Sequence, residues 1–268
     1  MTLIVDIGAH TGEDTGFYLA KGFDVVAVEA NPDMAKALSK RFTAKEADGK
    51  LRIVDRAISD EKEVRFFVNE DKPDWSSVVE KAGARHGTHF HEIVVPGITM
   101  AELFAQYGVP YFCKIDIEGG DIFCLRQLAK CEGRPDYVSF EAELGNPALL
   151  AEQISLIGAM GYTRFQIVNQ RNNKHTRPPN PAREGGYVDA RFDGHCSALF
   201  GKELDPDGWF DFARLQRRID HLNRWNVQLG SYNHASPTLL DKARAAANLV
   251  LGLPIGWYDI HATGARSS

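Results

Sequence analysis

The stretch LIVDIGAHTG, residues 3–12, decides the fold class expected for this chain. Its first five residues are apolar and mostly β-branched, apart from one aspartate, as in a strand that is buried inside a parallel sheet. The glycine at position 8 lets the backbone turn sharply and lets a ligand come close to the main chain. A helical pattern follows from Gly12 to Ala20, and the free N–H groups of its first turn would point at the same place. The stretch therefore predicts a strand, a turn and a helix that together hold a ligand.

The same unit repeats further along the chain. Residues 24–29 form a second apolar run, Asn31-Pro32 is typical of a helix start, and residues 51–54 are a third run. Strands that alternate with helices in this way build a parallel sheet with right-handed crossovers, so we expect an α/β fold. Further strands are expected at residues 111–117, 137–140, 162–168 and 196–200, and further helices at residues 121–128 and 147–160.

Residues 1–204 are expected to form one domain with two additions. Residues 63–69 have the pattern of a strand in an added hairpin, and the polar, Gly- and His-rich residues 70–90 that of a surface excursion. Residues 169–194, dense in Asn, Pro, Gly and Arg, predict a long loop or lid. As a lid over an acceptor, this loop would suit a phosphorylated or carboxylated substrate, through Arg171, His175, Arg177 and Arg183. The alternative is an unstructured surface loop.

Residues 205–268 are expected to form a C-terminal helical extension. Large apolar residues recur there at intervals of three and four, which is typical of an amphipathic helix: Trp209, Phe212, Leu215, Ile219, Leu222 and Trp225. Ser236-Pro237 would begin another helix, which would end near Gly252 and Pro254. We expect this extension to pack on the core or on a partner subunit.

Composition limits the partners of the chain. The net charge of −5 gives no general basic field, so nucleic acid is not an expected partner. No run approaches the length of about 18 apolar residues that a membrane span needs, and no signal-peptide pattern is visible. The four cysteines form no CxxC pair, which favours free thiols in a reducing compartment. A cytoplasmic protein is therefore expected, and the sequence leaves a homo-oligomer open.

The spacing of the first turn discriminates between two kinds of nucleotide ligand. Dinucleotide folds use G-x-G-x-x-G to bring the backbone against a pyrophosphate, whereas this turn has only Gly8 and Gly12, with Ala9 and His10 between them. The acidic Asp6 precedes it. A carboxylate suits a ligand that carries an ammonium and a sulfonium and no phosphate, as S-adenosylmethionine does. A glycine turn of purely structural origin is the alternative.

Acidic residues also follow three later strands. Glu29, about twenty residues after the glycine turn, is placed to accept both hydroxyls of a ribose, unless it only caps the helix at Asn31. Lys114, Asp116 and Glu118 alternate along an otherwise apolar strand, and buried charges are costly unless they are paired or functional. A structural ion pair between Lys114 and Asp116 is the alternative. Glu141 and Glu143 follow the next strand.

Several segments together resemble the FkbM family of S-adenosylmethionine-dependent methyltransferases. They match in order and spacing over residues 3–145: VDIGAHTG (5–12), AVEANP (27–32), AISD (57–60), SSV (76–78), Ile98-Thr99 and KIDIEGGD (114–121). The last is the most specific, being similar to the family signature K-I-D-V-E-G-x-E, and it departs from that signature at Asp121. The resemblance implies a Rossmann-like class I methyltransferase with a mostly parallel seven-stranded sheet, helices on both faces and an antiparallel last strand.

The resemblance also implies where the cofactor S-adenosylmethionine binds. Asp6, Gly8, His10 and Thr11 would surround its methionine part, within a binding turn that also contains Ala9 and Gly12. Glu29 would hold the ribose, and Asn31 and the turn from Asp55 to Ala57 would lie near adenine. Asp116 and Glu118 would sit beside the reactive methyl group and the acceptor.

The expected reaction is O-methylation of a hydroxyl on a small-molecule, sugar or glycan acceptor. An aliphatic hydroxyl is a poor nucleophile, so a positioned base should help by about 10²–10⁴-fold. The candidates are Asp116, Glu141 and His195, whereas a carboxyl acceptor would need no base.

Metal sites and other activities are weaker hypotheses. The spacing of His86, His89 and His91 fits no strong ligand motif, and no metal is expected. A magnesium site at Asp116, Glu141 and Glu143 is the alternative, because catechol-type methyltransferases place acids similarly. The rival activities are an NAD(P)-dependent oxidoreductase, which lacks a G-x-G turn and a Tyr-x₃-Lys pair here, and a non-catalytic nucleotide-binding module.

Overall fold

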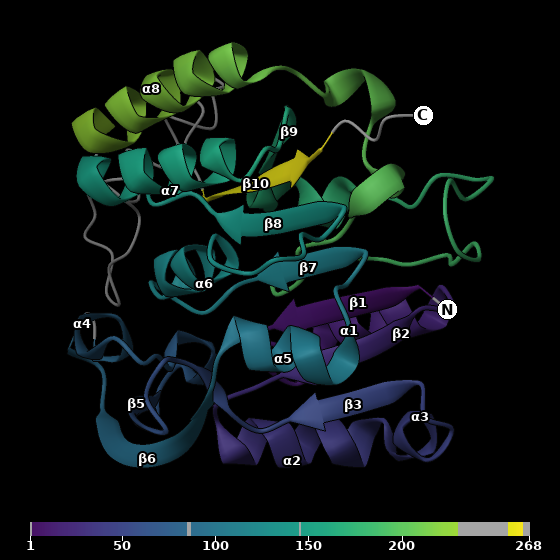
Figure 1. The fold of residues 1–268 in the computed structure, drawn as a ribbon, viewed down its shortest axis with the longest axis vertical. Helices are drawn as coiled ribbons and strands as arrows, with labels where there is room; N and C mark the ends of the chain where they lie inside the picture. Colours follow the sequence, from purple (N-terminus) through teal and green to yellow (C-terminus); the bar gives the residue numbers. More distant parts are fainter. Residues whose placement is uncertain (1, 85–86, 145, 230–256, 265–268) are drawn as a thin grey trace.

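The fold is built on a seven-stranded sheet (Figure 1). The computed structural model describes residues 2–84, 87–144, 146–229 and 257–264. The strand order is β3-β2-β1-β7-β8-β10-β9. β1, β2, β3, β7 and β8 run parallel, and β10 runs antiparallel to both of its neighbours. The bounds are Leu3–Ile7 (β1), Asp24–Val28 (β2), Leu51–Val54 (β3), Phe112–Ile115 (β7), Tyr137–Glu141 (β8), Arg164–Asn169 (β9) and Tyr258–Thr263 (β10).

Helices cover both faces of this sheet, as predicted. Alternate strand residues point to opposite faces, so Val5 and Ile7 join one core cluster and Ile4 joins the other. The first cluster is covered by α5 (Met100–Tyr107), α6 (Asp121–Leu128), α7 (Pro147–Ala159) and α8 (Phe212–Leu229). The second is covered by α1 (Glu13–Ala20) and α2 (Pro32–Arg41), with the short α3 (Thr43–Ala47) beside β3. The mostly parallel sheet with an antiparallel last strand is therefore confirmed.

The strand predicted at residues 196–200 is wrong. Ala198 and Phe200 are buried, but they pack face-on against α1 and the sheet, and the Phe200 ring stacks on Phe112 with centroids 5.1 Å apart. Alternating apolar residues are compatible with two arrangements. One is a strand paired within a sheet, and the other is an extended segment that packs on the face of a sheet. The last strand is instead β10, which fills the gap between β8 and β9.

The position of β10 also corrects the expected boundary at residue 204. Residues 205–268 are not helical throughout, because their part from Tyr258 to Thr263 completes the sheet of the first domain. The predicted amphipathic helix is present as α8, whose Leu215, Ile219 and Leu222 are buried in the first core cluster. The side chain of Trp225 and the helix expected from Ser236-Pro237 lie outside the described residues.

A smaller sheet and its excursion stand at the carboxyl ends of the parallel strands (Figure 1). It consists of β4 (Ala57–Ile58), β6 (Phe90–Ile98) and β5 (Glu63–Asn69), and β5 and β6 pair as the predicted hairpin. The excursion between these two strands contains a 3₁₀ turn, η1 (Pro73–Trp75), and the short α4 (Glu80–Gly83). Thr99 and Glu102 then form a capping box at the start of α5.

The loop predicted at residues 169–194 runs toward the other end of the sheet, where the parallel strands begin. It begins as a 3₁₀ turn, η3 (Gln170–His175), and later reaches Lys21, just after α1, where the Gly186 N–H donates to the Lys21 carbonyl at 2.8 Å. Arg183 donates to the carbonyl of Glu203, in η4 (Gly201–Glu203), at 2.8 Å. The 3₁₀ turn η5 (Pro206–Gly208) then leads to α8. The middle of the loop therefore packs against the rest of the domain. It lies away from the carboxyl ends of the parallel strands.

Within the described part of the chain, no helix combines the length and the apolar character that crossing a membrane requires.

Candidate active site

A cavity of about 580 Å³ opens at the carboxyl ends of the parallel strands. This is the position at which open α/β sheets bind their ligands, and the volume is in the range of small-molecule sites. Its walls come from five places: the turn after β1, the ends of β2, β7 and β8, the small sheet at residues 56–58 and 66, the excursion at residues 73–78, and a C-terminal group of residues. That last group is Gln170, Arg171, residues 194–197, Trp257 and Asp259.

Gly8 is required by the packing of two turns against each other. A Cβ at this position would lie 1.8 Å from the carbonyl oxygen of Asp116, and the residue has a φ of +83°. The turn after β1 therefore backs directly onto the turn after β7. His10 and Glu118, in these same two turns, also have positive φ values, of 50° and 36°, which are uncommon for residues other than glycine. Both line the cavity, so backbone strain is concentrated at this site.

Glu29 lies at the end of β2 and lines the cavity with only 8% of its surface exposed. Its two carboxylate oxygens accept from the backbone N–H groups of Asn31, at 2.8 Å, and His10, at 2.7 Å. Burial raises the pKa of this carboxyl, although both hydrogen bonds oppose the shift. Glu29 therefore holds the N-cap residue of α2 through one oxygen, while its carboxylate also forms part of the cavity wall.

His10 points its ring at Glu13, at the start of α1, with Nδ1 3.4 Å from a carboxylate oxygen. This hydrogen bond raises the pKa of His10. Burial of Glu13 works against its ionisation, but hydrogen bonds from His10 and Thr11 outweigh it and lower the pKa of Glu13 to about 2. This rim of the cavity therefore carries a fixed negative charge next to a readily protonated imidazole.

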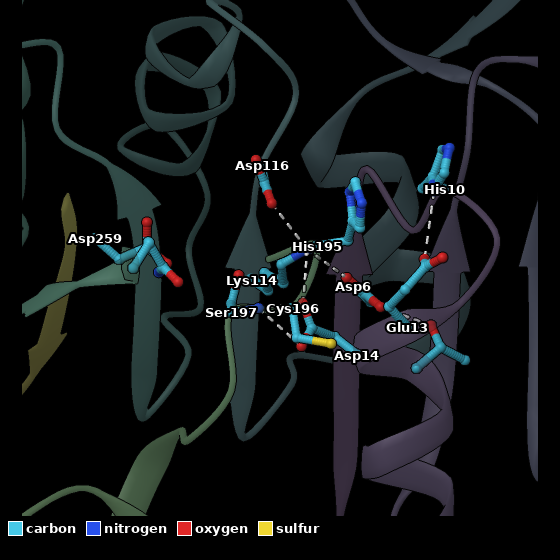
Figure 2. Close-up of polar contacts among 12 residues, drawn as sticks. Asp6, His10, Glu13, Asp14, Lys114, Asp116, His195, Cys196, Ser197 and Asp259 are labelled. Carbon is cyan, nitrogen blue, oxygen red and sulfur yellow. Dashed lines mark hydrogen bonds and ion pairs between the residues drawn. The ribbon is translucent and has the colours of Figure 1, made fainter. Parts of the chain in front are cut away.

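The buried ammonium of Lys114 stands at the centre of a group of three aspartates (Figure 2). Its Nζ lies 3.5 Å from Asp6, 3.2 Å from Asp14 and 3.1 Å from Asp116. Burial raises the pKa of Asp14 to about 6, and the Lys114 charge opposes that shift. The structural alternative foreseen for Lys114 is therefore present, but as a hub of three carboxylates. Asp14 and Asp116 both line the cavity, and of the three only Asp116 is substantially exposed.

Asp14 connects this hub to a distant part of the chain. Both of its carboxylate oxygens accept from the backbone N–H of Ser197, at 3.0 and 2.9 Å. This contact places His195 and Cys196 over the cavity (Figure 2). Burial raises the pKa of the Cys196 thiol to about 12, so it stands there as a neutral thiol.

Glu141 and Asp259 are neighbouring residues of the cavity lining. They are register partners on β8 and β10, and both line the cavity. Burial raises the pKa of Glu141, and the negative charge of Glu118 raises it further. Burial also raises the pKa of Asp259, to about 8. Asp121, the departure from the family signature, accepts from the N–H groups of Ile117 and Glu141, both at 2.9 Å, and so joins the ends of β7 and β8.

The structure brings most of the predicted site residues into one place. Those that line the cavity are Gly8, Ala9, His10, Glu29, Ala57, Asp116, Glu118, Glu141 and His195. Five others do not line it: Asp6, Thr11, Gly12, Asn31 and Asp55. Asp6 is fully buried and accepts from Thr15, Thr11 donates to Glu13, and Asn31 accepts from the Asp33 N–H as an N-cap. These residues support the cavity from behind. The role expected for each lining residue toward a cofactor stays a prediction.

Several lining residues were missed in the sequence. The excursion at residues 73–78 was read as a surface feature, yet Ser77 donates its hydroxyl to the carbonyl of Glu118 at 2.8 Å and holds the excursion against the cavity. Its SSV segment, among the family-like pieces, was the signal for this. Asp14, Ser197, Gln170 and Asp259 had no local signal, because each reaches the site through a contact across more than eighty residues.

The charge on the cavity wall is strongly unequal. Among the described lining residues, eight are carboxylic acids and three are permanent cations, namely Arg56, Lys114 and Arg171. Of the arginines expected to face an acceptor from the 169–194 loop, only Arg171 lines the cavity. Such a wall favours a cationic ligand and disfavours a pyrophosphate.

The histidines considered as metal ligands lie on the hairpin, away from the cavity lining. His89 contacts Asp71 at 3.1 Å and His91 contacts Glu70 at 2.8 Å, whereas His86 is outside the described residues. Over the described ranges, no three His, Cys, Asp or Glu side chains are placed to hold a metal ion together.

Comparison with known proteins gives one family match. The model of the methyltransferase FkbM domain matches residues 6–164, which include the end of β1 and all of β2, β7 and β8 and exclude the C-terminal group of the cavity. No curated protein matches the chain.

Solved structures resemble the chain distantly. Precorrin-6y C5,15-methyltransferase from Geobacter metallireducens is 13% identical with a TM-score of 0.37, covering 63% of this chain and 66% of its own. The Dnmt2 methyltransferase of S. pombe is 10% identical with a TM-score of 0.37, over 65% of this chain and 45% of its own. The YcgJ protein of Bacillus subtilis is 13% identical with a TM-score of 0.38, over 98% of this chain and 92% of its own. The chain thus spans less than two thirds of the first two of these proteins.

Proposed function

Since the chain belongs to the FkbM family of methyltransferases, we propose that its cavity binds S-adenosylmethionine and that it methylates an oxygen of a small-molecule, sugar or glycan acceptor. The single observation that carries the cofactor part of this proposal is the acidic cavity at the ends of β1, β2 and β7. The cofactor has an ammonium and a sulfonium and no phosphate, so it matches the charge of this wall.

The residues present fit the cofactor in three further respects. Glu29 keeps lone pairs free on both oxygens beyond the two backbone bonds it accepts, and these suit ribose hydroxyls. The Gly8–His10 backbone lines the cavity at the N-terminal end of α1. Ala30, Ala57 and Phe66 provide an apolar wall beyond Glu29, which suits a flat ring such as adenine.

When bound, S-adenosylmethionine supplies a methyl group on a positively charged sulfur, which an acceptor oxygen can displace. The chain has to align that oxygen and exclude water, and alignment alone is worth on the order of 7–11 kcal/mol. The candidate bases Asp116, Glu141 and His195 all line the cavity. One oxygen of Asp116 is engaged by Lys114, burial raises the pKa of Glu141, and His195 is exposed at the rim.

Labelling would test the reaction. Purified protein is incubated with S-adenosylmethionine carrying a ¹³C methyl group and with separate pools of monosaccharides, hydroxylated aromatic compounds and hydroxy acids. Transfer of the label to an oxygen, identified from the NMR shift of the methyl carbon, is the expected result. Transfer to nitrogen or carbon would contradict O-methylation and leave the cofactor assignment standing.

The rival oxidoreductase finds no comparable support. A pyrophosphate would meet the carboxylates of the cavity, and in the turn after β1 His10 stands where a G-x-G turn has its second glycine.

A further inference from the structure

Asp259 occupies a definite place at the edge of the site. It is the second residue of β10, and because this strand is antiparallel, its first residues lie where the parallel strands end. Side chains alternate along a strand, so Asp259 shares a face with His261, whose register partner Ser139 is in turn the partner of Lys114. Asp259 and the Lys114 hub therefore lie on the same face of the sheet (Figure 2).

A neutral donor holds the carboxyl of Asp259. The side-chain amide of Gln170 donates to Oδ2, and the nearby Ser197 side chain also acts to lower the pKa of this carboxyl. The orientation of Gln170 is fixed, because its oxygen accepts from the Asn173 amide, which also donates to the Cys196 carbonyl at 2.6 Å. All of these residues lie after residue 164, so this wall of the cavity is outside the segment that matches the family.

The charged groups that face Asp259 come from three elements. They are Asp116 and Lys114 from the β7 end, Asp14 from α1, and Glu141 from β8. Burial, followed by the negative charge of Asp116, raises the pKa of Asp259 to about 8, although Lys114 and Ser197 act in the opposite direction. A base works best when its pKa lies near the working pH. Asp259 meets this condition and, unlike Asp116, has no cation in direct contact among the described residues.

We infer that Asp259 takes the proton of the acceptor hydroxyl during methyl transfer, a role that rests on the proposed methyltransferase function. The acceptor oxygen forms its bond to the methyl carbon while the bond from that carbon to sulfur breaks, and the electron pair of the broken bond stays on sulfur. The hydroxyl proton passes to the Asp259 carboxylate. The result is a methyl ether, a neutral thioether and a protonated Asp259, which then loses its proton to solvent.

This role has a consequence that needs no acceptor. A carboxyl beside the reacting methyl should lose its proton when the positive sulfonium enters, and should keep it when the neutral thioether enters. S-adenosylmethionine and S-adenosylhomocysteine share adenine, ribose and ammonium, so the difference between them reports only the reacting end. Calorimetric titration at pH 7.5, in buffers of different ionisation enthalpy, measures the protons released on binding each of them.

The wild-type protein should release on the order of half a proton more with S-adenosylmethionine than with S-adenosylhomocysteine, because a carboxyl with a pKa near 8 is mostly protonated at pH 7.5. Asp259→Asn should remove this difference. Asp33→Asn, at an exposed carboxylate of α2, is the matched control and should retain it. Gln170→Ala removes a donor that favours the ionised form, so the difference should increase.

Equal proton release with the two ligands in the wild type would overturn the inference, as would a difference that persists in Asp259→Asn. An unchanged difference in Gln170→Ala would also contradict it, and this arm decides the matter if Asp259→Asn does not fold. Failure of both ligands to bind the wild type is a separate outcome, which would contradict the proposed function itself.

Discussion

The ammonium of Lys114 lies 3.1 Å from the carboxylate of Asp116, and it is the buried end of an ion pair whose other end is partly exposed in the cavity. Two more carboxylates, of Asp6 and Asp14, contact the same ammonium from behind. Lys114 therefore holds the cavity residue Asp116 in place. It also balances the buried negative charge of Asp6 and Asp14, which have no other cation beside them among the described ion pairs.

Replacing this cation should destabilise the fold. Lys114→Met would leave three carboxylates without their partner, and breaking a buried ion pair costs about 3–5 kcal/mol. Urea unfolding at neutral pH should show a loss of that size. Lys36→Met, at an exposed lysine paired with Asp33, should change the free energy of unfolding by less than about 1 kcal/mol. Equal small losses in the two variants would contradict the hub.

A comparison of variants at Gly8 and Gly22 distinguishes the cost of a packing clash from the cost of backbone strain. Both have positive φ values, of +83° and +93°, but a Cβ at Gly8 would meet the Asp116 carbonyl, whereas one at Gly22 would meet nothing within 4 Å. Gly22→Ala should cost only the left-handed conformation, roughly 1–2 kcal/mol. Gly8→Ala should cost about 1–3 kcal/mol more, since the two turns must separate. Thermal unfolding of both variants measures the difference, and equal losses would mean that the turns do not pack as described.

Glu29 should determine cofactor affinity. Glu29→Ala should weaken binding of S-adenosylmethionine about tenfold or more, because hydrogen bonds to a charged group contribute roughly 1.5–3 kcal/mol. The variant should also lose stability, since the Asn31 and His10 N–H groups lose their acceptor. Calorimetric titration of folded variant checks the affinity, with Asp33→Asn as the control. Unchanged affinity would remove Glu29 from the ribose site.

The proposed base also makes the stability of the protein depend on pH. The folded-state pKa of Asp259 is raised to about 8, so its protonated form stabilises the fold, and that contribution is lost as the pH rises through 8. Between pH 6.5 and 8, the free energy of unfolding should fall by up to about 1 kcal/mol per pH unit in the wild type and more slowly in Asp259→Asn. His261, whose pKa burial lowers to about 3, acts in the opposite direction and mostly below pH 7, where the unfolded imidazole binds a proton that the folded one does not, and it does so in both proteins. Parallel curves for the two proteins, from urea unfolding across the window, would be inconsistent with the shift.

The part of the site that the sequence predicts is the part made by local geometry. The turn after β1, Glu29 and the residues after β7 each follow a buried strand directly, so the ends of parallel strands bring them together. Asp14 and Ser197 meet across 183 residues, and nothing in the neighbourhood of either residue specifies the other.

The C-terminal wall was missed for a related reason. Residues 196–200 alternate in polarity like a strand, and only the tertiary packing of Phe200 on Phe112 distinguishes the two arrangements. Asp259 belongs to an antiparallel strand inserted between β8 and β9, and its place in the sheet depends on pairing with strands far earlier in the chain.

The most direct test of the central claim is calorimetric titration of the purified protein with S-adenosylmethionine, S-adenosylhomocysteine and NADH, with and without EDTA. We predict micromolar binding of the two sulfur-containing ligands, no binding of NADH, and no effect of EDTA. Binding of NADH alone, or of none of the three, would contradict the assignment of the cavity to S-adenosylmethionine.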